Sequence, residues 1–509
     1  MRTKGFITKI GLAFPVLSLI ALMIVGLSSD GFAAGRPEIV IAQSTDATSL
    51  DPAFRVDTAT GNIQKHIFDS ILTRKADMSI GPGLAESVQK VSDTKWLLKL
   101  RKGVSFTNGE PMNAAALKFS IERILDPKLK APSKSWWENF TEVKIIDDTT
   151  VEITTKTRDP LFQPRLTLLV AVPPKYVRDV GDSKFSLQPI GTGPYELVEW
   201  KKDDHVTLKA NKNYWGGAPP VERVTFRVVP EELSRVAALQ TGEADLIVGI
   251  SPAQAERLRG EKGHRIEITP TTRIMALHFN SDVALGNQLK FRQAVAYAVN
   301  RDEIIKGLLK GFVQPVTSVF SPGIPGWPKG MDVSFPYDLE RAKKLVSELN
   351  LGDTELVMRS SSGRYPYDRD TALAIGGQLK KAGLNVKVRP EEWGTFFADL
   401  KSRKMSPVYL MGQGNVWIDP YPQLEAFFYS KGFLSTWSDP TFDGLLESSN
   451  LVEGEARVKV FGQALQHLHD TVAGVPLFAQ VFICGVNDRL KWKPRIDEVI
   501  WAMDMALAQ

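Results

Sequence analysis

The stretch "TELVMRSSSGRYPYDRDTALAIGGQLKKAGLNVKVRPEEW", residues 354–393, contains the pattern that decides the fold class. Its two ends, "TELVMRS" and "LNVKVRPEEW", are predicted strands. Between them, "DTALAIGGQLKKAG" has the apolar spacing of a helix and ends at a glycine. A strand, a helix and a second strand in this order predict a βαβ unit, and therefore a partly parallel sheet.

The regions around this unit predict further α/β structure. Residues 60–185 combine alternating segments, such as "TKWLLKLRKG" and "TTVEITTK", with a helix that Asn113 is expected to cap, so they form a mixed α+β unit. From Pro189 onward, short strands and turns follow each other with one helix among them. The length of 509 residues predicts roughly three or four units, and the composition, 43% hydrophobic and 24% charged, is that of a globular protein.

The first 33 residues have the pattern of an export signal. Arg2, Lys4 and Lys9 precede an uncharged apolar run, residues 10–27, and small residues follow, with cleavage expected after Ala33. The alternative is a retained membrane anchor, since the run is about long enough to span a bilayer. The absence of a cysteine near this position argues against a lipid anchor. No other stretch approaches about 18 apolar residues, so the exported chain is expected to be soluble.

Charge and cysteine content exclude several classes of protein. A net charge of +5, without a block of Lys and Arg among aromatic residues, does not predict nucleic-acid binding. The one cysteine, Cys484, has no partner for an internal disulfide. Because it lies in the apolar run "VPLFAQVFICGVN", it is predicted to be a buried strand residue rather than a catalytic thiol.

The motifs of common enzymes are missing. There is no zinc-protease motif, no phosphate-binding lysine loop and no nucleophile elbow, and no acid pair or Ser-His pair stands out. "GTGPY", beginning at Gly191, resembles a shortened dinucleotide motif, but Pro194 and a strand replace the helix that such a site needs. His467 and His469 are two residues apart, which puts them on different sides of a helix and argues against zinc. The sequence therefore predicts no catalysis, no metal and no cofactor.

Several motifs, spread from about Ile39 to Met505, resemble those of one family, the family 5 extracellular solute-binding proteins of ABC transporters, which bind peptides and nickel. The segments that carry the resemblance are "GLAESVQKVSDTKWLLKLRKGVSFTNGEPMNAAALKFSIERI", "PIGTGPYELVEW", "NKNYWGGAPPVERVTFRVVPEELSRVAALQTGEADL", "FRQAVAYAVNRDEII", "YDLERAKKLVSELN" and "VPLFAQVFICGVNDRLKWKPRIDEVIW". They occur in the order that the family has.

The resemblance implies a type II periplasmic-binding-protein fold: an α/β protein of two lobes joined by crossover strands, with an extra α+β subdomain in lobe I. The implied division is a signal peptide (1–33), lobe I (34–60, 186–275 and the C-terminal return 480–509), the extra subdomain (61–185) and lobe II (276–479). Such proteins close on their solute by hinge bending.

The loop "MGQGNVWIDPYPQ", residues 411–423, is the first candidate for contact with a solute. By the family pattern it projects from lobe II into the cleft, so that Trp417 and Tyr421 pack on the solute and on lobe I. Dipeptide-binding members hold the peptide amine with an aspartate, and that position here is Val416, which departs from the pattern. Asp419 remains as the acid of this loop, either as a ligand or as a turn residue before Pro420.

A second candidate group follows the predicted strands of the βαβ unit. Arg364, with Tyr365 beside it, lies in the loop "RSSSGRYPYDRD" and is expected to bind a carboxylate, or else to form a structural ion pair. Trp393 ends a predicted strand, where α/β sheets place ligands, although it could equally be a core residue.

In lobe I, the loop "STDATSLDP" ends a predicted strand. Thr48 and Ser49, with Thr45, are candidate hydrogen-bond donors to a solute, and turn formation is the alternative. Trp136 and Trp137 are expected to pack inside the extra subdomain.

The sequence therefore predicts a periplasmic solute receptor of an ABC importer. It is expected to be a monomer that captures a peptide or peptide-sized solute between two lobes and delivers it to a permease in the inner membrane. The alternatives are the same scaffold with a non-peptide solute (an opine, an oligosaccharide or a metal chelate), an exported hydrolase, or a periplasmic chaperone.

Overall fold

The computed structural model describes residues 38–55, 57–320, 324–362, 364–415 and 417–508. The predicted signal peptide, residues 1–33, and Val416 lie outside the described residues. Within the described residues, no helix is both long enough and apolar enough to span a membrane.

Most strands belong to one large sheet with the order β15-β14-β16-β12-β17-β11-β1-β10-β9-β8, in which β13 pairs with β17. Its strands are β1 (Glu38–Gln43), β8 (Tyr195–Lys201), β9 (His205–Ala210), β10 (Arg223–Val228), β11 (Leu246–Val248), β12 (His264–Phe279), β13 (Gln314–Pro315), β14 (Leu356–Ser362), β15 (Val386–Glu392), β16 (Val408–Gln413) and β17 (Gly474–Asn487). Smaller sheets are formed by β4 (Ala85–Lys90), β5 (Lys95–Leu100), β7 (Thr150–Thr155) and β6 (Phe140–Asp147), by β2 (Leu72–Arg74) with β3 (Ile80–Pro82), and by β18 (Leu490–Lys491) with β19 (Ala506–Leu507).

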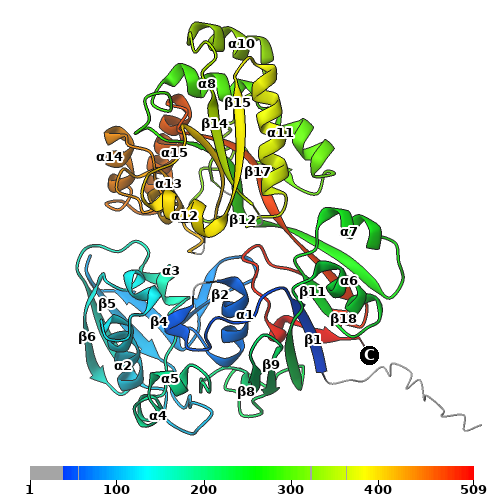
Figure 1. Ribbon diagram of the computed structural model, residues 1–509. Coiled ribbons are helices and arrows are strands. Elements are labelled where there is room, and N and C mark those ends of the chain that lie inside the picture. The colour runs from blue at the N-terminus through cyan, green and yellow to red at the C-terminus, as the bar shows by residue number, and fades with distance from the viewer. Residues whose placement is uncertain (1–37, 56, 321–323, 363, 416, 509) are drawn as a thin grey trace, which may run out of the picture. The chain divides into compact units, whose positions relative to one another are not determined.

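Helices lie between these strands (Figure 1). They are α1 (Thr58–Ile67), α2 (Ala114–Leu125), α3 (Phe162–Leu166), α4 (Pro174–Val180), α5 (Asp182–Phe185), α6 (Glu232–Gln240), α7 (Pro252–Leu258), α8 (Leu289–Ala298), α9 (Arg301–Glu303), α10 (Leu339–Glu348), α11 (Asp368–Lys381), α12 (Trp393–Lys401), α13 (Pro420–Phe428), α14 (Pro440–Ser448) and α15 (Gly454–Asp470). The shorter helical turns are η1 (Pro52–Phe54), η2 (Pro132–Trp136), η3 (Ile304–Leu308) and η4 (Ala502–Asp504).

The βαβ unit predicted at residues 354–393 is confirmed. β14 and β15 pair in parallel, from Leu356 opposite Val386 to Ser362 opposite Glu392, and α11 connects them. The helix packs closely on β15, because a Cβ at Gly376 would lie 2.2 Å from a methyl group of Val388. Only glycine fits at this contact without a shift of the neighbouring strand.

Two long strands join the two halves of the large sheet. β12 and β17 run antiparallel to each other, and both continue from the half that contains β11 into the half that contains β16 (Figure 1). Their pairing is interrupted between Pro270 and Ile274. Such a break in the ladder bends a strand and leaves backbone groups unpaired. The crossover expected from the family resemblance is therefore present, and its irregular point lies at residues 270–274.

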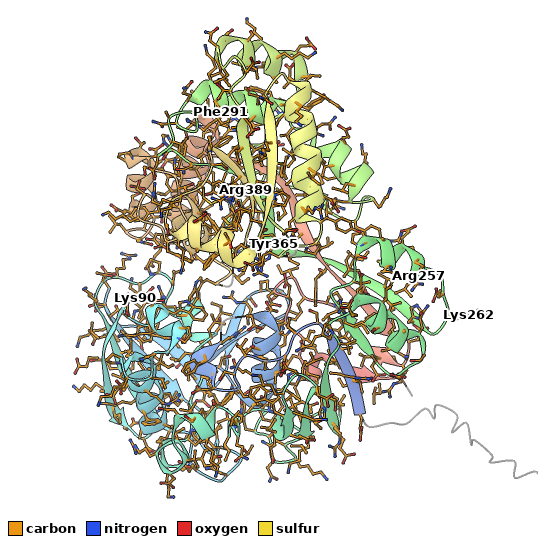
Figure 2. The ribbon with its side chains drawn as sticks, viewed as in Figure 1. Lys90, Arg257, Lys262, Phe291, Tyr365 and Arg389 are labelled. Atoms are coloured by element: carbon orange, nitrogen blue, oxygen red, sulfur yellow. The ribbon has the colours of Figure 1, made fainter. Side chains whose placement is uncertain are left out.

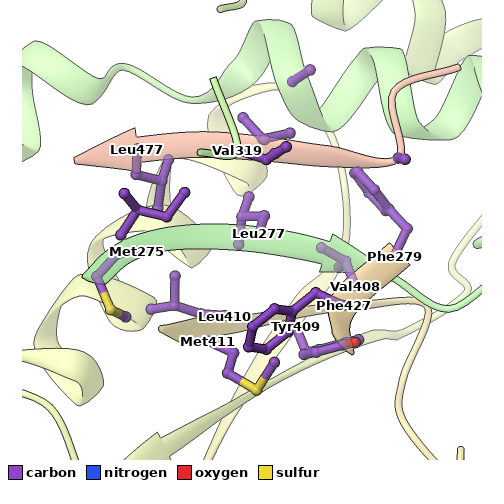
Figure 3. Packing of buried hydrophobic residues seen from close by; sticks show 14 of the residues in the cluster. Met275, Leu277, Phe279, Val319, Val408, Tyr409, Leu410, Met411, Phe427 and Leu477 are labelled. Carbon is purple, nitrogen blue, oxygen red and sulfur yellow. The ribbon is translucent and has the colours of Figure 1, made fainter. Parts of the chain in front are cut away.

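Buried hydrophobic residues form separate clusters, which is why one chain can build several units. In lobe II, β12, β16 and β17 contribute Met275, Leu277, Leu410 and Leu477 to one core (Figure 3). The four-stranded sheet β4-β5-β7-β6 has its own core with α2, and further clusters lie around β1 and α6. The domain boundaries themselves remain a prediction.

The "GTGPY" motif forms a turn that packs closely on the end of α1. A Cβ at Gly191 would lie 2.0 Å from the carbonyl oxygen of Ile67, and one at Gly193 would lie 2.5 Å from that of His66. The N–H of Gly193 donates to the Ile67 oxygen at 2.9 Å. The two glycines therefore let this turn approach the last residues of α1, which confirms the prediction of a turn.

Candidate functional site

Three candidate residues follow three neighbouring parallel strands. β14 pairs in parallel with both β15 and β16, so the carboxyl ends of all three strands lie at the same edge of the sheet. Arg364 follows β14, Trp393 follows β15, and Trp417 follows β16. Figure 2 shows Tyr365 at this edge. Open α/β sheets place their ligands at such an edge, so this is where the site is expected.

Arg364 is held between two aromatic rings. Its guanidinium group lies 5.2 Å from the ring centre of Tyr365 and 5.2 Å from that of Trp393. Asp368 accepts hydrogen bonds from the backbone N–H groups of Arg364 and Tyr365, at 3.1 and 3.2 Å, and so orders the loop. Arg364 is exposed and forms no salt bridge with any residue that the structure describes. The structural ion pair left open by the sequence is therefore not observed there.

The structure adds Arg273, which sequence reasoning missed. This residue lies in the irregular part of β12, and its guanidinium group is 5.6 Å from the ring centre of Tyr365, on which Arg364 also lies. Arg273 also lies against the second glycine of "MGQG", since a Cβ at Gly414 would lie 2.9 Å from its Nη1 atom. The first, Gly412, leaves room for Tyr365, whose hydroxyl donates to the Gly412 oxygen at 3.2 Å. A break in strand pairing leaves no local signal in the sequence, so only the fold reveals this second arginine.

Trp417 packs against the extra subdomain. Its ring meets that of Trp136 edge-on at 5.1 Å, and the guanidinium group of Arg165 lies 5.1 Å from its ring centre. Its carbonyl oxygen accepts a hydrogen bond from Nη2 of Arg74 at 2.9 Å. Trp417 is 9% exposed. The aromatic residue of this loop therefore reaches beyond its own lobe. Trp136 packs on the core of the subdomain, as predicted, and its ring also contacts Trp417, while Trp137 packs on Phe140 inside the subdomain.

Asp419 has a structural role in the described residues. It caps α13 by accepting the N–H of Tyr421 at 2.9 Å, and both carboxylate oxygens bind Arg457, at 2.7 and 2.9 Å. The two alternatives for this residue were a ligand contact and a turn; the cap and the ion pair favour the turn. Tyr421 is half-buried against the lobe II core, and burial raises the pKa of its hydroxyl.

Thr48 and Ser49 make local contacts. The N–H of Thr48 donates to Oγ1 of Thr60 at 2.9 Å, and Oγ of Ser49 accepts the N–H of Asp51 at 3.1 Å. These bonds shape the loop after β1 and favour the turn-forming alternative. Whether either residue also touches a solute remains a prediction.

The residues considered as a catalytic thiol or as zinc ligands are either buried or hydrogen-bonded to other groups. Cys484 is fully buried in β17, as predicted, and burial raises the pKa of its thiol. Nε2 of His467 lies 2.7 Å from Asp439, and Nδ1 of His469 lies 2.9 Å from the oxygen of Val333. Within the described part of the chain, no group of three acidic, histidine or cysteine side chains is arranged to hold a metal ion.

The fold and the site define a class of protein: two α/β halves joined by crossover strands, with polar and aromatic side chains at the strand edge, form a solute-binding protein. Residues 79–435 match the bacterial extracellular solute-binding proteins, family 5 Middle, and the chain belongs to this family. It is therefore a solute-binding protein of ABC transporters, in a family of extracellular binding proteins rather than enzymes.

Known relatives agree with this assignment. The chain is 30% identical over 408 residues to the glutathione-binding protein GsiB of Shigella dysenteriae, covering 78% of each protein. It is also 30% identical over 400 residues to GsiB of Escherichia coli strain K12, covering 76% of each.

Solved structures confirm the predicted two-lobed fold. The substrate-binding protein CtaP of Listeria monocytogenes superimposes with a TM-score of 0.83 at 23% identity, covering 93% of this chain and 99% of that one. The binding protein DppA of Helicobacter pylori, in complex with the peptide STSA, gives a TM-score of 0.78 at 23% identity, covering 93% and 98%.

Proposed function

We propose that this protein captures a short peptide or peptide-sized solute in the periplasm and delivers it to an ABC permease in the inner membrane, without catalysing a reaction. The names of similar proteins support the class of solute: GsiB binds glutathione, and DppA was solved with a peptide. Closure around the solute removes water, and this strengthens each polar contact.

One observation carries the proposal: Arg364, at the carboxyl edge of three parallel strands, is oriented by Tyr365 and Trp393 but forms no salt bridge with a described residue. A guanidinium group that is held in place and has free donors is suited to a carboxylate, which it binds through two parallel hydrogen bonds. Arg273, near the same ring, adds a second positive charge. A peptide carboxylate is the group that we expect here.

Arg364→Ala is expected to weaken solute binding at least tenfold, since a charge-assisted hydrogen bond contributes about 1.5–3 kcal/mol. Isothermal titration calorimetry with glutathione and a set of di- and tripeptides measures this loss. Arg369→Ala is the matched control, because Arg369 is also exposed but lies on α11, and the ring contacts described for Tyr365 and Trp393 do not include it. Equal affinities in wild type and Arg364→Ala would contradict the assignment of the carboxylate site.

A panel of ligands tests the class of solute. Thermal-shift measurements across peptides, opines, oligosaccharides and nickel–histidine chelates separate the peptide proposal from the non-peptide alternatives, because a ligand stabilises the folded state by mass action. Cleavage of any peptide in the panel would instead indicate a hydrolase. Preference for long denatured polypeptides would indicate a chaperone.

An ion-pair cluster links the extra subdomain to lobe II. Glu453, before the first residue of α15, lies 2.8 Å from Lys90 and 2.7 Å from Arg158. Lys90 belongs to β4, and Figure 2 shows it at the margin of that sheet. The hydrogen bond to Lys90 lowers the pKa of Glu453, and the pKa of Lys90 is raised by the same bond. These contacts hold the two regions together in the observed arrangement.

Because a solute bound between the lobes needs the two regions held together, Glu453→Gln is expected to weaken solute binding. The loss is a factor of up to about five, since an exposed ion pair contributes at most about 1 kcal/mol. The effect is expected to vanish in high salt, which screens exposed charges. Calorimetry at low and high salt with the tightest-binding peptide measures it. Glu455→Gln, a change at a nearby exposed acid, is the control, and an effect that persists in high salt would contradict the role of these charges.

A further inference from the structure

α1 of lobe I is buried from Thr60 to its last residue, and within that part Lys65 is the exception. Residues 60–64, 66 and 67 are buried, while Lys65 is half-buried. The helix is fastened to the C-terminal return: Oδ1 of Asn62 accepts the N–H of Ile500 at 3.1 Å, and Nε2 of His66 accepts that of Ala502 at 2.9 Å. Between these contacts, the Lys65 ammonium lies 4.9 Å from the ring centre of Trp501. These contacts therefore fix the Lys65 side chain in place.

Arg55, which precedes α1 in the chain, packs its side chain against the same helix. A Cβ at Gly61 would fall 2.5 Å from its Nε atom, so the guanidinium group packs directly on α1 at this glycine. Arg55 and Trp136 line a common pocket, and Trp136 is the residue that contacts Trp417 of lobe II. Arg55 thus lies close to the place where the extra subdomain and lobe II meet.

The acids near these two cations are engaged elsewhere. Asp497 binds Arg495 at 3.0 and 2.8 Å, and Asp57 caps α1 by accepting both donors of Thr60 at 2.8 Å. Asp69 accepts hydrogen bonds from three side chains, those of Tyr214, Trp215 and Thr192, at 2.7, 2.8 and 3.0 Å.

Neither Arg55 nor Lys65 has a salt bridge within residues 38–55, 57–320, 324–362, 364–415 and 417–508. Burial lowers the pKa of each, against the attraction of the nearby carboxylates. Removing a cation from water without pairing it is costly. Two such cations, Lys65 on α1 and Arg55 packed against it, therefore form a site that is prepared for an anion.

We propose that Arg55 and Lys65 bind a second anionic group of the solute, so that the solute is a dianion with one carboxylate at Arg364 of lobe II and another at this lobe I pair. The inference rests on the proposed function and narrows its substrate class to acidic peptides. Two anionic ends bridging the lobes would also couple binding to closure, because only the closed form pairs both groups.

Pairs of tripeptides that differ by one charge test this assignment: Glu against Gln, placed first, second or third among alanines. Wild type is expected to bind the Glu member of at least one pair tenfold or more tightly than the Gln member. Lys65→Gln and Arg55→Gln are expected to remove this ratio, whereas Lys202→Gln, at an exposed lysine, should keep it. Arg364→Ala should weaken both members of a pair equally, because both carry the terminal carboxylate.

The outcomes separate the two proposals. A ratio that Lys65→Gln and Arg55→Gln leave unchanged would overturn the lobe I site, while the loss in Arg364→Ala would still support peptide binding. If no tripeptide binds wild type, the proposed peptide function fails. The lobe I site is then tested by thermal unfolding of the solute-free protein. Lys65→Met should raise the Tm of the solute-free protein by about 2 °C or more, since it removes an unpaired cation. An unchanged or lower Tm would overturn the site.

Discussion

Replacing Arg123 with methionine is expected to lower the free energy of unfolding by about 3–5 kcal/mol, the cost of leaving a buried charge without its partner. Arg123, on α2, binds both oxygens of Asp51, at 3.2 and 2.5 Å, and also pairs with Asp182. Asp51 is fully buried, and its carboxylate also accepts the N–H of Ala53 at 3.0 Å. Methionine fills the space but leaves the carboxylate in an apolar surrounding.

This prediction also concerns the solute site, because Asp51 caps η1, the turn that leads directly to Arg55. Urea unfolding measures the loss in stability. Arg227→Met is the matched control: it breaks an exposed pair with Glu243, so its cost should stay below about 1 kcal/mol. The double variant Asp51→Asn/Arg123→Met should recover part of the loss, since the charge that remains without its partner, Asp182, is exposed rather than buried. A loss in Arg123→Met no larger than in Arg227→Met would show that the pair contributes little.

A fall in pH from about 6.5 to about 4 is expected to destabilise the protein by about 3 kcal/mol or more through two buried histidines. Burial lowers the pKa of His66 to about 4 and that of His278 to about 3. Nδ1 of His66 donates to the oxygen of Asn62 at 2.8 Å, while Nε2 accepts the N–H of Ala502. Nε2 of His278 lies 3.0 Å from the amide nitrogen of Gln413, so it also accepts. A proton on either accepting nitrogen would replace a hydrogen bond by two facing donors.

The direction of the stability change follows from the lowered pKa values of the two histidines. Below the ordinary pKa of 6.5 the unfolded chain takes up protons that the folded chain refuses, so stability is full above that pH and decreases below it. The free energy of unfolding, measured from pH 7 to pH 4.5, is expected to show this slope, and His66→Asn should reduce it. His205→Gln, at a histidine beside exposed acids, is the control variant. An identical slope in wild type and His66→Asn would contradict the prediction.

The site residues differ in how far the sequence alone can predict their position and role. Arg364, Trp393 and Trp417 could be singled out because each follows a predicted strand, and parallel strands end at one edge. The role of Asp419 stayed open until Arg457 was seen to bind it, 38 residues later in the chain. Arg55, Lys65 and Arg273 gave no local signal, since an arginine or lysine looks the same in a sequence whether or not an acid pairs with it.

Neighbouring residues and the family resemblance were enough to predict the βαβ unit around α11, the cap at Asn113, which accepts the N–H of Ala116, the turn at "GTGPY", and the family. These follow from local periodicity, turn chemistry and motifs in order. The tertiary structure alone decided which charges remain unpaired. Asp51 meets Arg123 across 72 residues, and Lys65 meets Trp501 across most of the chain. The electrostatic energy of a charge depends on what lies within a few ångströms of it, and the folding of distant segments onto each other, rather than the order of residues, determines those neighbours.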